Sequence, residues 1–169
     1  MSSNVQKKKI IRIPEVKGSI KRKVNLAKKT WFRVGGLAEL FFQPQDAEDL
    51  IFFLKNLDRK VPVQVIGATS NLLIRDGGIS GVVIKLGSGF NYLNFFKNKF
   101  TVGTGTSCVK VARTLIKKGI SGMEFFIGIP GTVGGSIRMN AGAYGNETKD
   151  FLKSITAIDR NGEIHKVNS

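Results

Sequence analysis

The segment GIPGTVGGSIRMNAGAYG, residues 128–145, constrains the fold more than any other part of this chain. It holds six of the 20 glycines and one charged side chain, Arg138, although the whole chain carries a net charge of +15. Glycine costs conformational entropy in regular helices and strands. Such density therefore predicts turns with positive φ, or a backbone that approaches a large flat ligand, or, more simply, a glycine-rich connecting loop. The lack of lysine favours the ligand.

A second glycine-bearing turn follows a predicted strand. The strand PVQVI at residues 62–66 leads directly into GATSN at residues 67–71. Backbone N–H groups free of bulky neighbouring side chains can line a concavity for anionic oxygens, and Ser70 and Asn71 add donors. An ordinary β-turn is the alternative. Together the two glycine segments predict a ligand with phosphates and an aromatic system, such as a dinucleotide.

A third turn, GTGTSC at residues 103–108, begins like the dinucleotide fingerprint GxGxxG. Cys108 stands where the third glycine belongs, and Glu124 lies near the place of the acidic ribose partner. The broken fingerprint is a weak signal, so a Rossmann site is not favoured. Cys108 is expected to pack in a helix, and the single histidine, His165, to lie on a surface strand.

The order of predicted elements favours an α+β fold over a doubly wound sheet. Asp46 and Ser107 are predicted N-caps of two helices, and the first helix favours parallel pairing of the strands that it joins. Strands are expected at residues 38–43, 62–66, 82–86 and 99–102, with a terminal hairpin at 153–159 and 163–167 around Asn161-Gly162.

We divide the chain into a basic arm at residues 1–17, a βαβ lobe at 18–88 and a second lobe at 89–169 that is incomplete at its C-terminus. Residues 1–33 hold eleven of the 27 lysines and arginines but one of the 12 acidic residues. The arm is either solvated or contacts polyanions. A basic nucleic-acid-binding module is a weaker alternative, because it leaves the glycine segments unexplained.

Other function classes lack their motifs. The sequence has no P-loop, GxSxG, HExxH or cysteine pair, so no metal site is predicted. There is no run of about 20 apolar residues to span a membrane. One cysteine and no signal peptide favour a reducing cytoplasm.

Four blocks resemble the UDP-N-acetylenolpyruvoylglucosamine reductase (UDP-N-acetylmuramate dehydrogenase) family of flavoenzymes, which act in peptidoglycan synthesis, cell wall biogenesis, cell shape and cell division. They are TWFRVGG at residues 30–36 with Ala38, IGATSNLL at 66–73, GMEF at 122–125, and GIPGTVGG through NAGAYG at 128–145. The resemblance implies a two-lobed FAD-binding fold of the vanillyl-alcohol-oxidase (PCMH) type, without the C-terminal substrate-binding domain.

The resemblance also implies the cofactor-binding residues. A pyrophosphate turn is implied at Gly67, Ala68, Thr69, Ser70, Asn71 and Leu72. Approach to the flavin and pyrophosphate is implied for Ile129, Pro130, Gly131, Gly134, Gly135, Asn140, Gly142, Ala143 and Tyr144. Tyr144 faces either the flavin or the UDP-sugar. The family usually has glycine where this chain has Thr69; because a β-branched residue resists positive φ, the turn is expected either to use negative φ or to be rearranged.

In this family NADPH reduces FAD, and a hydride then passes to the enolpyruvyl double bond of the UDP-sugar. The resemblance places the catalytic serine, arginine and glutamate beyond Ser169, so no catalytic residue is predicted here. The chain alone is expected to bind FAD without completing the reaction. Another FAD oxidoreductase of the same fold is the alternative, and the oligomeric state is left open.

Overall fold

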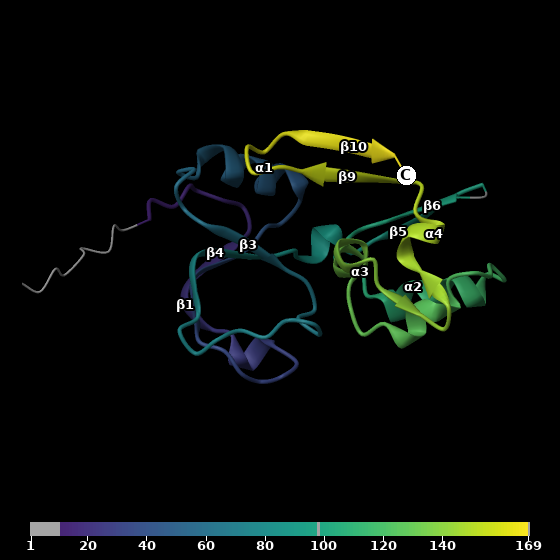
Figure 1. The fold of residues 1–169 in the computed structure, drawn as a ribbon. Helices are drawn as coiled ribbons and strands as arrows, with labels where there is room; N and C mark the ends of the chain where they lie inside the picture. Colours follow the sequence, from purple (N-terminus) through teal and green to yellow (C-terminus); the bar gives the residue numbers. More distant parts are fainter. Residues whose placement is uncertain (1–10, 98, 169) are drawn as a thin grey trace, which may run out of the picture.

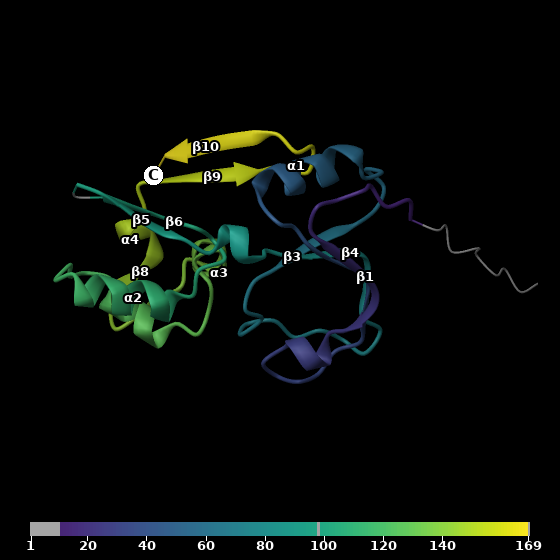
Figure 2. The same ribbon diagram turned by 180° about the vertical axis from the view of Figure 1, so that it is seen from behind.

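The computed structural model describes residues 11–97 and 99–168, which form two lobes with a hairpin lying across them (Figure 1). Turned to the back, the same arrangement shows the hairpin above both lobes (Figure 2). Among these residues, no helix has the length and apolar character needed to cross a membrane.

Lobe 1 is a four-stranded sheet in the order β1-β2-β4-β3. Its elements are β1 (Ser19–Asn25), the short 3-10 helix η1 (Ala27–Lys29), β2 (Leu37–Gln43), α1 (Ala47–Asn56), β3 (Val63–Ile66) and β4 (Ile79–Lys85). Strand β1 is antiparallel to β2, whereas β2 and β3 both run parallel to β4. The predicted parallel relation is present, but β4 lies between the two strands that α1 joins, because its apolar run is buried on both faces.

Helix α1 begins where the sequence predicts, since the side chain of Asp46 accepts a hydrogen bond from the N–H of Asp49 at 2.9 Å. The helix covers one face of the sheet, where Phe53 stacks on Phe42 with ring centroids 4.2 Å apart. The opposite face is covered by a second cluster, in which Leu26 and Ile74 pack against Phe41 and Val83. The sheet is therefore a buried middle layer.

The segment before β1 packs onto lobe 1. Ile11, Ile13 and Val16 contact the α1-side cluster, and the buried carboxylate of Asp49 accepts hydrogen bonds from the N–H groups of Lys17 and Gly18. Residues 1–10 of the predicted basic arm lie outside the described part. Strand β1 was not predicted, because its basic side chains mask the apolar alternation of SIKRKVN.

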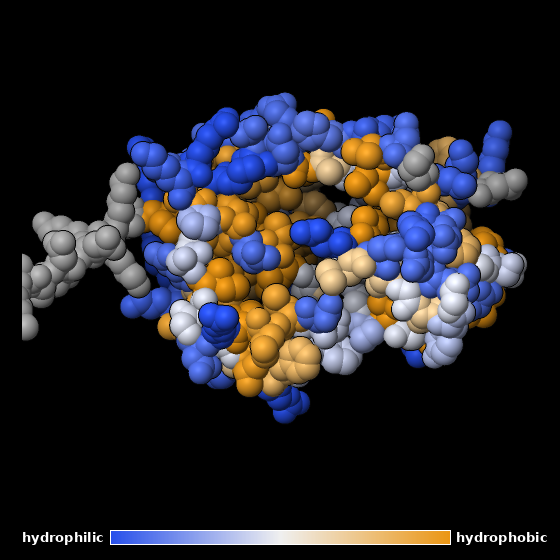
Figure 3. Space-filling model, in the orientation of Figure 1, coloured by the Kyte–Doolittle hydropathy of each residue, from blue (hydrophilic) through white to orange (hydrophobic). Residues whose placement is uncertain are grey.

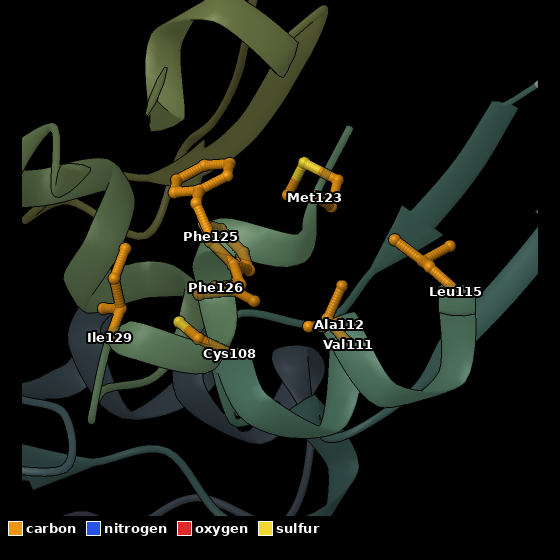
Figure 4. Packing of buried hydrophobic residues seen from close by; sticks show 9 residues of the cluster. Cys108, Val111, Ala112, Leu115, Met123, Phe125, Phe126 and Ile129 are labelled. Carbon is orange, nitrogen blue, oxygen red and sulfur yellow. The ribbon is translucent and has the colours of Figure 1, made fainter. Parts of the chain in front are cut away.

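Lobe 2 follows the short 3-10 helix η2 (Ser88–Phe90). It comprises β5 (Leu93–Phe96), β6 (Lys99–Val102), α2 (Cys108–Lys117), η3 (Glu124–Gly128), α3 (Val133–Met139), β7 (Gly142–Ala143), β8 (Asn146–Glu147) and α4 (Thr148–Phe151). In its core, side chains of α2 point toward those of η3, so that Val111 and Ala112 lie beneath Phe125 and Phe126 (Figure 4).

The terminal hairpin, β9 (Ser154–Ile158) and β10 (Ile164–Asn168), pairs as predicted around its Asn-Gly turn. Its first strand continues from lobe 2, but its far end lies on α1 of lobe 1 (Figure 1). Ile158 packs against the lobe 1 core, and Arg160 donates to the carbonyl oxygens of Asp58 and Val61. The hairpin thus ties the two lobes together.

Candidate functional site

The turn at residues 67–71 leaves β3 at the carboxyl edge of the parallel strands, which is where open α/β sheets bind ligands. The backbone N–H groups of Ala68, Thr69, Ser70 and Asn71 donate no hydrogen bond to any other described residue. Thr69 is 5% exposed, whereas Ala68 and Ser70 are half-buried and Asn71 is exposed, and native chains rarely leave a buried N–H group such as that of Thr69 unpaired. Four successive free donors suit an anionic ligand.

Thr69 adopts positive φ, at 60°. The expectation that the turn uses negative φ at Thr69 is therefore wrong. The hydroxyl of Thr69 lies 2.9 Å from the carbonyl oxygen of Lys29 and 2.6 Å from that of Ala68, so its single hydrogen is shared between the two acceptors. These contacts offset a conformation that costs a branched residue roughly 1–2 kcal/mol. The side chain thereby joins the turn to η1, forty residues earlier.

The glycine segment of lobe 2 meets this turn. A Cβ on Gly67 would lie 2.8 Å from the hydroxyl oxygen of Thr132, and a Cβ on Gly131 would lie 3.8 Å from the hydroxyl oxygen of Ser70. The two segments that the sequence singled out, residues 67–71 and 128–145, are therefore neighbours. Figure 3 shows the surface hollowed between the lobes beneath the hairpin, with apolar side chains gathered on the lobe 1 side.

The turn at residues 103–108 forms backbone hydrogen bonds with the glycine segment. Thr104 and Thr106 accept backbone hydrogen bonds from Gly134 and Val133, and Cys108 donates to the carbonyl of Gly131. A Cβ on Gly103 would lie 2.2 Å from the carbonyl oxygen of Phe90. The two glycines of this turn therefore permit close packing on the segment between the lobes, which agrees with the low weight given to a Rossmann site.

Asn140 ends α3 in a left-handed conformation, with φ of 44°. Its side-chain nitrogen donates to Glu147 at 2.9 Å, and its oxygen accepts from the N–H of Lys149 at 3.0 Å. In this structure the amide fixes the β7–β8 region. Its predicted contact with the cofactor stays a prediction.

Tyr144 is 84% exposed at the tip between β7 and β8. A Cβ on Gly128 would lie 2.9 Å from its ring, so the two ends of the glycine segment touch. An exposed aromatic ring in this place can face a ligand, although its predicted role stays untested.

The other predicted site residues divide by burial. Leu72 is half-buried against the lobe 1 cluster, whereas Ile129 and Ala143 pack into or onto the lobe 2 core. Pro130 is exposed, and the remaining glycines, Gly134, Gly135 and Gly142, lie at the start of α3 and in β7. The apolar residues pack in the core beneath the segment. Gly134 and Gly142 allow close packing within the lobe, because a Cβ there would lie 3.0 Å from the Cβ of Thr104 and 2.8 Å from the carbonyl oxygen of Asn146.

Lobe 1 also has a pocket whose residues, apart from Ala68, were not predicted as site residues. An open pocket of about 830 Å³ lies beside the turn and is lined by Lys28, Lys29, Trp31, Arg33 and Ala68, among others. We call it the basic pocket. The sequence signal for this pocket is a group of three cationic residues, Lys28, Lys29 and Arg33, around Trp31.

The two reactive side chains considered from the sequence lie away from the turn. Cys108 is fully buried with Sγ 3.0 Å from the hydroxyl of Ser136, and burial raises the pKa of its thiol. His165 lies on exposed β10, 3.1 Å from Asp159. The described residues contain no cluster of three metal-ligating side chains.

Comparisons with known proteins agree with this geometry. A family model described as an FAD binding domain matches residues 38–168. The UDP-N-acetylenolpyruvoylglucosamine reductase of Orientia tsutsugamushi (strain Boryong) is 49% identical over 160 residues, 92% of this chain and 53% of the relative. That of Rickettsia rickettsii (strain Sheila Smith) is 51% identical over 152 residues, 90% of this chain and 52% of the relative.

A solved structure gives the same result. The crystal structure of UDP-N-acetylenolpyruvylglucosamine reductase from Thermus caldophilus superposes with a TM-score of 0.76 at 30% identity, and the match covers 89% of this chain and 53% of that one. The predicted α+β FAD-binding fold is thereby confirmed. The chain spans about half the length of the curated relatives that it matches.

Proposed function

Because this chain belongs to the FAD binding domain family, we propose that it supplies the flavin-holding part of a UDP-N-acetylenolpyruvoylglucosamine reductase. One observation carries the proposal. The free N–H groups of the turn at residues 67–71 lie beside Gly131 and Thr132 of the other lobe. A ligand that joins phosphates to a flat ring system matches both halves of that site.

The residues present fit FAD. The N–H groups of residues 68–71 can donate to diphosphate oxygens. A Cβ on Gly131 would meet no atom closer than 3.7 Å, so the bare backbone there allows a flat ring to approach closely. When bound, FAD supplies the acceptance and transfer of hydride. The chain binds and orients it: Thr69 fixes the turn, and the buried Ile129 and Val133 fix the glycine segment.

The whole protein's reaction is part of the proposal. The enolpyruvyl UDP-sugar would be the acceptor, as the names of the relatives state. NADPH as the reductant and peptidoglycan synthesis as the pathway are what the family resemblance implies. Since the chain spans about half their length, we propose that it binds FAD but forms no UDP-N-acetylmuramate by itself. A cytoplasmic setting stays a prediction.

Titration of the purified chain with FAD tests the binding. We expect flavin absorbance to stay with the protein through gel filtration. A matched pair of variants places the site: Gly67→Ala brings a Cβ within 2.8 Å of the Thr132 hydroxyl, whereas Gly77→Ala meets nothing within 4 Å. We expect Gly67→Ala to weaken FAD binding about 10-fold and Gly77→Ala to leave it unchanged.

Two results would contradict the proposal. A chain that retains no flavin is not a flavin-holding unit, and equal FAD affinities of the two variants would move the site elsewhere. Formation of UDP-N-acetylmuramate by this chain from NADPH and the UDP-sugar would overturn the statement that it is inactive alone.

A further inference from the structure

The residues that line the basic pocket include three cations and no carboxylate. Among the described residues, no carboxylate oxygen lies within 4.0 Å of a side-chain nitrogen of Lys28, Lys29 or Arg33. Lysines elsewhere do find partners, as in the pair between Lys55 and Glu163 at 3.3 Å. The Lys29 ammonium lies 5.1 Å from the centre of the Phe41 ring, a contact that leaves its charge in place. Cations without a carboxylate beside a turn with free N–H groups point to an anion that is shared by both.

Lys85 adds a further cation at the same edge of the sheet. It is the last residue of β4, and its register partner is Ile66, the residue before Gly67. Lys85 is half-buried, and its pKa is lowered, first by burial and then by the charge of Lys29. The charge of Lys29 therefore acts on Lys85, and an anion bound near both would relieve that repulsion.

The turn at residues 67–71 is in direct contact with Lys29. The carbonyl of Lys29 accepts the hydroxyl of Thr69 at 2.9 Å, so the backbone of η1 is fixed to the turn. Ala68 lines the basic pocket together with Lys29. The free N–H groups and the backbone of Lys29 are therefore placed by the same contact, and the Lys29 ammonium lies over the Phe41 ring.

We propose that Lys29 and Lys85 bind the diphosphate of the dinucleotide beside the turn at residues 67–71. This inference rests on the proposed function, because it assigns side chains to the ligand proposed there. Lysine ammonium groups bind phosphates as point charges. The N–H groups of residues 68–71 orient the diphosphate, and the two lysines neutralise it.

The test measures FAD dissociation constants for Lys29→Gln, Lys85→Gln and the control Lys60→Gln. Lys60 is exposed and precedes β3, at the far end of that strand from the turn, so its loss changes the net charge equally. We expect the first two variants to weaken FAD binding about 10-fold each and the control to stay within about twofold. Riboflavin, which lacks both phosphates, should bind all four proteins equally.

A second measurement guards against misfolding. Because Lys85→Gln removes a partly buried charge, its thermal midpoint without flavin should be no lower than that of the unmodified chain. Its midpoint should rise less when FAD is added. A lower midpoint without flavin would show that Lys85 serves the fold, which overturns the inference.

The inference and the proposed function fail in different ways. If the unmodified chain binds no FAD, both are wrong. If the unmodified chain binds FAD and both lysine variants bind it within about twofold of that affinity, the inference alone is wrong. Equal losses for FAD and riboflavin would also overturn it, because phosphate would then not be the group that the lysines contact.

Discussion

The hydroxyl of Thr69 donates a hydrogen bond to the carbonyl oxygen of Lys29 at 2.9 Å, across 40 residues of sequence. This bond holds a branched residue at φ of 60° in the turn whose N–H groups face the proposed diphosphate. The turn and η1 are therefore one unit, and a change at Thr69 should be felt in both.

Thr69→Val keeps the branched shape and removes the hydroxyl. We expect the free energy of unfolding to fall by about 1–2 kcal/mol, because the Lys29 carbonyl loses its partner while the positive φ remains. Thr69→Ser keeps the hydroxyl and should change stability by less than about 0.5 kcal/mol. Urea denaturation measures both. A valine variant as stable as the native chain would show that the bond does not support the turn.

Asp49 fastens the N-terminal segment to lobe 1. Its buried carboxylate accepts hydrogen bonds from the backbone N–H groups of Lys17, Gly18 and Gln45, at 2.8–2.9 Å. Asp49→Ala leaves these donors unpaired, so we expect a loss of about 2–4 kcal/mol of unfolding free energy. Glu48→Gln, in the adjacent exposed position, is the matched control and should cost less than about 0.5 kcal/mol. Thermal or urea unfolding of both variants decides the matter, and equal losses would contradict this role.

Local chemistry accounts for what the sequence predicted. The caps at Asp46 and Ser107 and the Asn-Gly hairpin turn are set by residues within a few positions of each other, so they are visible without tertiary structure. The two glycine segments were found by composition and by resemblance. The proximity of these two segments was expected because both were assigned to one phosphate-bearing ligand.

Distant partners account for what was missed. The position of β4 between β2 and β3 depends on packing of the whole sheet. The positive φ of Thr69 depends on a carbonyl in η1, which no local pattern reveals. The basic pocket likewise joins η1 to Ala68 across the fold. Sequence reasoning thus found the turns but not the contacts that fix them.

Arg160 fastens the hairpin to lobe 1. Its Nη2 donates to the carbonyl oxygens of Asp58 and Val61, each at 3.1 Å. Arg160→Ala should therefore free the hairpin and speed amide hydrogen exchange in β9 and β10 by about 10-fold or more. Lys166→Ala, on exposed β10, should leave the exchange unchanged. Unaltered exchange in Arg160→Ala would mean that Ile158 and the turn hold the hairpin without the guanidinium.

The buried thiol of Cys108 should make stability fall at alkaline pH. Burial raises its pKa above the usual value of about 9. Because the folded pKa is the higher one, the stabilisation is complete below the pKa of the unfolded thiol and is lost as pH rises through the folded pKa. Between about pH 8.5 and pH 10, the unfolding free energy of the native chain should therefore fall more steeply than that of Cys108→Ala, by up to about 1.4 kcal/mol per pH unit. Urea titrations across this range measure the two slopes. Parallel slopes would show that the thiol does not contribute to the pH dependence.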